Sequence, residues 1–130
     1  MSASPPPMPS GLLVQSVYIG EEGEESGWRV WADGRHESRR DGAPWEVVST
    51  LDADRLAAVR EALDDGSLEE IAGIHRGAEG PRQGATLWFQ ALSRGEPHSV
   101  GLVGGAHLDA LDALTARLVT SLAGPDFPFV

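Results

Sequence analysis

The chain has 130 residues, the length of one domain, and contains no cysteine. Disulfide frameworks, thiolate metal sites and cysteine nucleophiles are therefore excluded. Its formal net charge is −10, which disfavours binding to nucleic-acid backbones and to anionic membrane surfaces. No apolar run is long enough to cross a bilayer, and the first ten residues do not have the pattern of a secretory signal. A cytoplasmic location is expected.

Residues 1–10 contain four prolines and predict a disordered or polyproline leader, with a ligand for proline recognition as the alternative. A strand is expected over residues 12–19, and because neither of its faces is cleanly polar it should lie centrally in a sheet. The following loop, residues 20–27, is punctuated by glycines and carries Glu21, Glu22, Glu24 and Glu25. It lacks the spacing of a calcium loop, so it predicts either a solvated loop or a negatively charged lip for a partner.

A second strand is expected over residues 28–32, with Trp28 facing the core and Trp31 pointing away from it. Asp33-Gly34 is a strong two-residue turn signal, so residues 35–39 should return as an antiparallel strand. Asp52 is then a plausible N-cap for a helix that closes at Gly66. The spacing of Ser67 and Glu70 predicts a short turn through Ile71 and Ile74.

The clearest pattern lies between residues 84 and 122. Ala85, Leu87, Phe89 and Ala91 alternate on one face of a strand, with Trp88 on the opposite face. Residues 94–97 supply a turn and the alternation resumes at Val100 and Leu102. After Gly104-Gly105, leucines recur at helical spacing at positions 108, 111, 114, 118 and 122.

Together these elements predict a single α+β domain over residues 11–124, in the order β-β-β-α-β-β-α. About five mainly antiparallel strands should carry two main helices on one face. Residues 125–130 form a proline-rich tail containing Phe127 and Phe129.

No residue pattern points to catalysis, a metal site or a cofactor. None of the four histidines lies in a metal-binding pair at i, i+4, and His107 with Asp109 is two residues apart at a helix start. The serines lack a nucleophile elbow. Gly104-Gly105 ahead of a helix leaves an anion-binding site as an alternative, although the spacing matches neither a P-loop nor a dinucleotide fingerprint.

Residue types typical of protein interfaces are more informative. Trp31 and Trp88 lie off the predicted core face, and tryptophan is enriched at interface hot spots. Arg35 belongs to a basic cluster that either forms internal ion pairs or meets an acidic partner. The candidate partner-binding residues are Glu21, Glu22, Glu24, Glu25, Trp31, Arg35 and Trp88.

The segment Trp28-Arg29-Val30-Trp31-Ala32-Asp33-Gly34-Arg35 resembles the strand, Asp-Gly turn and strand of emfourin-like domains, small bacterial inhibitors of thermolysin-type metalloproteases. Leu51 to Leu56 is similar to the helix start that follows in that group. The resemblance implies a non-catalytic domain that binds another protein, such as a metalloprotease. We therefore expect a protein-binding module that acts either as an inhibitor or as an immunity-type protein against a toxin. A small-ligand or anion-binding protein and a homo-oligomeric scaffold subunit are the alternatives.

Overall fold

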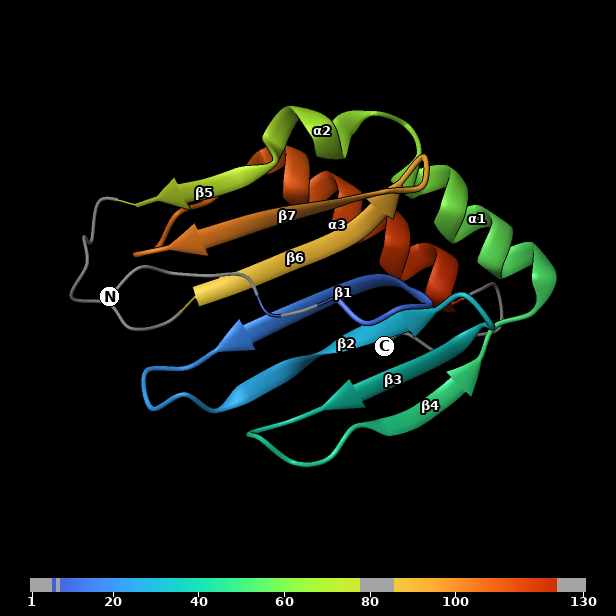
Figure 1. The fold of residues 1–130 in the computed structure, drawn as a ribbon, viewed down its shortest axis with the longest axis horizontal. Helices are drawn as coiled ribbons and strands as arrows, with labels where there is room; N and C mark the ends of the chain where they lie inside the picture. The colour runs from blue at the N-terminus through green and yellow to red at the C-terminus, as the bar shows by residue number, and fades with distance from the viewer. Residues whose placement is uncertain (1–5, 7, 78–85, 124–130) are drawn as a thin grey trace.

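The computed structural model describes residues 6, 8–77 and 86–123. The chain forms one sheet with helices packed on one face (Figure 1). The strands are β1 (Leu12–Ile19), β2 (Glu25–Trp31), β3 (Arg35–Arg39), β4 (Glu46–Thr50), β5 (Gly73–Arg76), β6 (Thr86–Ser93) and β7 (Glu96–Val103). The helices are α1 (Ala53–Leu63), α2 (Ser67–Ile71) and α3 (Asp109–Ala123). The predicted α+β class is confirmed.

The sheet has seven strands in the order β4-β3-β2-β1-β6-β7-β5, so the expected count of about five was too low. All neighbouring pairs are antiparallel except β5 and β7, which run parallel. The two strands that the sequence did not indicate, β4 and β5, form the ends of this order. Both are short and mostly exposed, so neither carries the alternation of buried and exposed residues that identifies a strand. The predicted central position of β1 is confirmed.

The first helix begins as predicted, because the Asp52 carboxylate accepts a hydrogen bond from the Arg55 amide at 2.9 Å. It ends at Leu63, earlier than expected. Gly66, predicted to close it, instead precedes α2 with a φ of +93°. Ile74 lies in β5 and not in a turn that continues α2.

The hydrophobic core lies between the three helices and the helix-facing side of β1, β2, β6 and β7. Its largest fully buried side chains are Phe89, Leu63, Leu68, Leu114 and Leu118. Each buried side chain of this size stabilises the fold by about 1.5–3 kcal/mol relative to exposure. The leucine spacing of the last helix and the alternation of β6 therefore identified the core correctly.

Two hairpin turns differ from their predicted lengths. The turn between β2 and β3 contains three residues, Ala32 to Gly34, and the Gly34 amide donates to the Trp31 carbonyl at 2.9 Å. The turn between β6 and β7 contains only Arg94 and Gly95, with φ angles of +54° and +81°. These positive angles match the right-handed twist of a two-residue hairpin.

The second face of the sheet, turned toward the viewer in Figure 1, carries no helix among the described residues; we call it the open face. Within the described segments, no helix is long and apolar enough to span a membrane. The loop that the sequence predicts over residues 77–84 lies outside the described residues except for Gly77, and so do the tail at residues 125–130 and most of the predicted leader residues.

Candidate functional site

Alternation in β2 and β3 brings arginine and tryptophan side chains together on the open face. Arg29 and Trp31 share this face of β2, and Arg35 and Arg39 share it on β3. Trp45, just before β4, completes the group. These five residues, Arg29, Trp31, Arg35, Arg39 and Trp45, are called the Arg–Trp stack below.

Cations and aromatic rings alternate along the Arg–Trp stack. The Arg29 guanidinium carbon lies 4.9 Å from the Trp31 ring centroid and 4.1 Å from that of Trp45. Arg35 covers Trp31 at 4.9 Å, and Arg39 covers Trp45 at 5.3 Å. Each cation–π contact contributes about 0.5–2 kcal/mol, depending on its desolvation. The stack therefore holds two large rings and three cations in one arrangement without burying them in the core.

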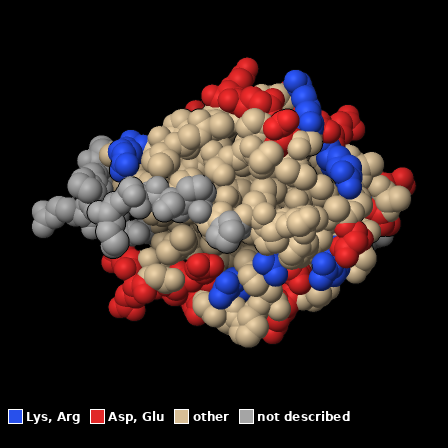
Figure 2. Space-filling model, viewed as in Figure 1, with Lys and Arg blue, Asp and Glu red and all other residues tan. Residues whose placement is uncertain are grey.

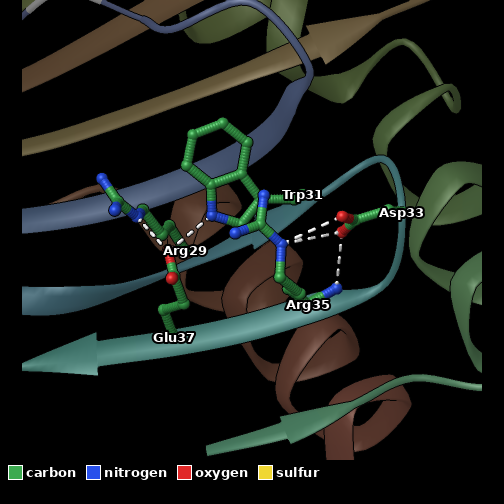
Figure 3. Close-up of polar contacts among 5 residues, drawn as sticks. All are labelled: Arg29, Trp31, Asp33, Arg35 and Glu37. Atoms are coloured by element: carbon green, nitrogen blue, oxygen red, sulfur yellow. Dashed lines mark hydrogen bonds and ion pairs between the residues drawn. The ribbon is translucent and has the colours of Figure 1, made fainter. Parts of the chain in front are cut away.

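Glu37 fixes the centre of the stack from β3 (Figure 3). One oxygen, Oε1, accepts a hydrogen bond from Arg29 Nε at 2.6 Å and another from Trp31 Nε1 at 2.5 Å. Arg29 and Glu37 are direct partners across the β2–β3 ladder. Burial raises the pKa of the Glu37 carboxyl, but the hydrogen bonds from Trp31 and Arg29 outweigh it and leave the pKa below its usual value. Glu37 is thus an anion at neutral pH.

Two further ion pairs close the ends of the stack. Arg35 Nε lies 2.9 Å from Asp33 Oδ2, and Arg39 Nη1 lies 3.3 Å from Glu25 Oε1. Together with Glu37, three carboxylates face three guanidinium groups. The cluster therefore has little net charge, and its arginines are held by carboxylates and indoles rather than left free for an anionic ligand. This arrangement suits a contact surface.

Strand β4 borders the Arg–Trp stack and forms one edge of the sheet. All five of its residues are exposed, and the exposed fractions of Val47 and Val48 are 56% and 58%. It pairs with β3 on one side, and its register shifts between His36 and Glu37. In the view of Figure 2, arginines lie beside acidic and uncharged residues over this lower part of the open face.

The candidate residues from the sequence occupy three different environments. Trp31 and Arg35 belong to the Arg–Trp stack. Glu21, Glu22 and Glu24 are exposed in the loop between β1 and β2, while Glu25 starts β2 and pairs with Arg39. Trp88 lies on the open face as expected, but only 3% of it is exposed. It packs over Gly101, where an added Cβ would lie 2.7 Å from the ring. Trp88 is therefore inaccessible to a partner in this conformation.

His107, Asp109 and Asp112 come together at the start of α3, which the sequence spacing did not predict. His107 Nε2 lies 3.1 Å from a carboxylate oxygen of each aspartate. All three side chains are exposed, and they are the one group within the described segments whose ligand atoms are close enough to share a metal ion. Because His107 already contacts both carboxylates, these contacts explain its position without a metal ion.

The contact residues predicted from the sequence did not include Trp45, Val47, Val48 or Arg29. Arg29 and Trp31 lie on the same side of one strand. The strand after the tight turn carries Arg35, Glu37 and Arg39 on that side, so Arg29 and Trp31 were identifiable from the sequence. Internal ion pairing, the first interpretation of the Arg35 cluster, describes these residues correctly. Trp45 and β4 depend on where a loop returns, which no local pattern encodes.

Comparison with protein-family models, with curated proteins and with solved structures found no match to this chain. The resemblance to emfourin-like domains therefore rests on the sequence segments quoted above.

Proposed function

We propose that this chain is a small non-catalytic protein-binding module that contacts its partner through β4 and the adjoining Arg–Trp stack. The observation that carries the proposal is the exposure of β4 along all five residues, with two valines more than half exposed. Isolated exposed apolar side chains are common, but adjacent ones on an unpaired strand edge form a surface that another chain can cover.

Edge strands are usually protected by lysine, proline, inward-pointing charges or β-bulges. In β4 the only charged residue is Glu46, at its first position. An extended segment of a partner could therefore add to the sheet beside β4, with main-chain hydrogen bonds supplying affinity. The register shift opposite β3 bends the edge and would restrict which segments fit.

The Arg–Trp stack would supply specificity next to this edge. Trp31 and Trp45 are half-buried and held by arginines on their faces, so contact with a partner would immobilise few additional rotamers. Tryptophan and arginine are also the residue types that dominate interface energies. Trp31 and Arg35, two of the candidate residues from the sequence, thus contribute to the proposed surface.

The acidic loop would act on the rate of association. The loop between β1 and β2 exposes Glu21, Glu22 and Glu24, which contribute to the net charge of −10. Such a field steers the molecule toward a basic partner face. Replacing these three residues by lysine should slow association about tenfold at low salt and weaken its salt dependence. Unchanged association rates across the salt range would contradict steering.

The partner class follows from the sequence resemblance alone. An inhibitor of a metalloprotease, or an immunity-type protein against a toxin, would each present a stable surface without chemistry of its own. The anion-binding alternative is less well supported, because Asp109 and Asp112 in the first turn of α3 repel an anion at that helix start. The turn at Gly104 and Gly105 also backs directly onto Gly77.

The test is affinity capture with three tagged baits: the native chain, the double variant Val47→Lys and Val48→Lys, and Tyr18→Lys. Tyr18 is a matched control because it is 49% exposed but lies on the central strand β1. We expect one stoichiometric protein with the native and Tyr18 baits, and its loss with the β4 variant. Equal capture by all three baits would exclude β4 as the contact surface. No captured protein together with a doubled mass in solution would favour the homo-oligomeric alternative.

A further inference from the structure

A second part of the open face is buried without being covered by a helix. Gln15 on β1 and Gln90 on β6 are direct neighbours across the sheet, and they are only 4% and 3% exposed. The Gln15 amide nitrogen donates to Gln90 Oε1 at 2.8 Å, and Gln90 Nε2 lies 3.2 Å from Ser99 Oγ on β7. These three residues, Gln15, Gln90 and Ser99, form the amide track. Buried polar groups of this kind imply that something lies over them.

The residue that lies over the amide track comes from the beginning of the chain. Gln90 Nε2 donates to the Pro6 carbonyl at 2.8 Å, across 84 positions of sequence. The chain reverses direction just before β1, where the Leu12 amide donates to the Pro9 carbonyl and Gly11 has a φ of +89°. This reversal brings Pro6 and Pro9 beside Gln15 and Val17 of β1.

A cavity of about 290 Å³ continues from this contact toward the Arg–Trp stack. Its lining combines prolines, a valine, an indole and polar groups: Pro6, Pro9, Gln15, Val17, Glu25, Arg29 and Trp45. The described leader residues thus form one wall, and the sheet with Trp45 forms the other.

This surface has the chemistry that an extended proline-rich segment requires. Proline has no N–H, so its backbone offers only carbonyl oxygens to a partner. The Gln15 amide nitrogen donates to Gln90 Oε1, so the Gln90 Nε2 group is the one that faces the leader. Proline rings pack on aromatic surfaces, and a polyproline helix loses little entropy on binding because it is already extended.

We propose that the amide track and the adjoining cavity form a binding site for an extended proline-rich peptide, and that Pro6 of the chain's own leader covers the amide track in the free protein. This site does not include β4 and does not depend on the function proposed above, although its cavity shares Arg29 and Trp45 with the Arg–Trp stack. A proline-rich segment of another protein can enter only by displacing the leader. Because the leader is tethered, its effective concentration is in the millimolar range, so such a competitor must be strong or locally abundant.

The glutamine side chains allow a direct test. The sequence contains three glutamines, Gln15, Gln83 and Gln90, and no asparagine, so a ¹⁵N–¹H spectrum has three side-chain amide pairs. The leader variant replaces Pro5, Pro6, Pro7 and Pro9 by serine in the full chain. We expect the Gln90 pair to shift and to exchange faster with water in this variant. Adding a peptide of residues 4–10 to this variant should return the Gln90 signals to their native position. The peptide concentration at half-saturation should be at least tenfold lower for the variant than for any effect on the native chain.

Four comparisons make the test decisive. Asp54→Ser, at an exposed position of α1 on the opposite side of the sheet, should leave the Gln90 pair unchanged. Identical Gln90 signals in the native chain and the leader variant, with the backbone spectrum showing both folded, would overturn the docking of the leader. Equal restoration by a peptide with serines in place of its prolines would overturn the proline-rich class. Gln90 signals that depend on protein concentration, together with a dimer mass, would replace the tethered leader by the leader of a second copy.

Discussion

The two halves of the open face are made of similar residues but have opposite accessibility. On β1, β6 and β7, Trp88 and Gln90 are each only 3% exposed. On β2, β3 and β4, Trp31 is half-buried while Val47 and Val48 are more than half exposed. The first half is closed by local packing and by the leader, and the second half is held by ion pairs and cation–π contacts at the surface.

This difference shows that a tryptophan off the helix-facing side has no fixed role. Trp88 lies over a glycine of the neighbouring strand, so its ring packs closely against the sheet. Trp31 lies between two arginines and donates to Glu37, so its ring stands at the surface. The neighbour across the ladder decides which outcome follows.

The largest expected effect separates the two tryptophans. Trp88→Ala should lower the free energy of unfolding by about 3–5 kcal/mol, because a buried ring is lost and a cavity remains. Trp31→Ala should cost about 1–2 kcal/mol, since it removes cation–π contacts and one hydrogen bond. Urea denaturation followed by far-ultraviolet circular dichroism measures both values. Equal losses would mean that the two halves do not differ in packing.

Removing the charge at the centre of the stack tests how firmly the exposed half is held. Glu37→Gln should cost about 1–3 kcal/mol in unfolding free energy, because Arg29 loses its anionic partner in a part-buried site. Asp33→Asn is the matched control at an exposed ion pair and should have no measurable effect. A neutral Glu37→Gln would show that the cation–π contacts alone maintain the stack.

Acid should weaken the molecule through carboxyls whose pKa is lowered in the folded state. Hydrogen bonds from Ser67, together with Arg117, lower the pKa of Asp65 from 3.8 to about 2. A depressed carboxyl pKa stabilises the fold above its unfolded value, so this contribution is present above pH 3.8 and lost as pH falls through 2. Asp65→Asn should remove about 1 kcal/mol at pH 7 and flatten the loss of stability between pH 4 and pH 2. Parallel stability curves for the native and variant chains would contradict this assignment.

The smallest effect on stability is expected at the edge proposed to bind a partner. Val47→Lys with Val48→Lys should change the unfolding free energy by less than about 0.5 kcal/mol per site, since both side chains are exposed. The same pair is expected to abolish partner capture. A loss of several kcal/mol on thermal denaturation would instead show that β4 is needed for folding, and the capture result would then report misfolding.

Much of the fold was predictable because several elements carry strong local signals. Leucines at helical spacing identified α3, and Asp52 marked the start of α1. Alternation located β2, β6 and β7, and the Asp-Gly turn signal located β3. The edge strands β4 and β5 were missed, since an exposed strand that pairs on one side needs no buried face. Of the candidate site, Trp31 and Arg35 were identified by their side of the strand, whereas Trp45 and the two valines were not.

The sequence by itself determined the class, the core and the side of the strand on which Trp28, Trp31 and Trp88 lie, because these depend on periodicity within one element. Only the tertiary structure decided that Trp88 is buried over Gly101, that Trp45 joins Arg29 and Arg39, and that Pro6 reaches Gln90. Each of these contacts joins segments whose approach depends on strand order and on the path of a loop. Such distances are set by the packing of the whole chain, and no local pattern of residues encodes them.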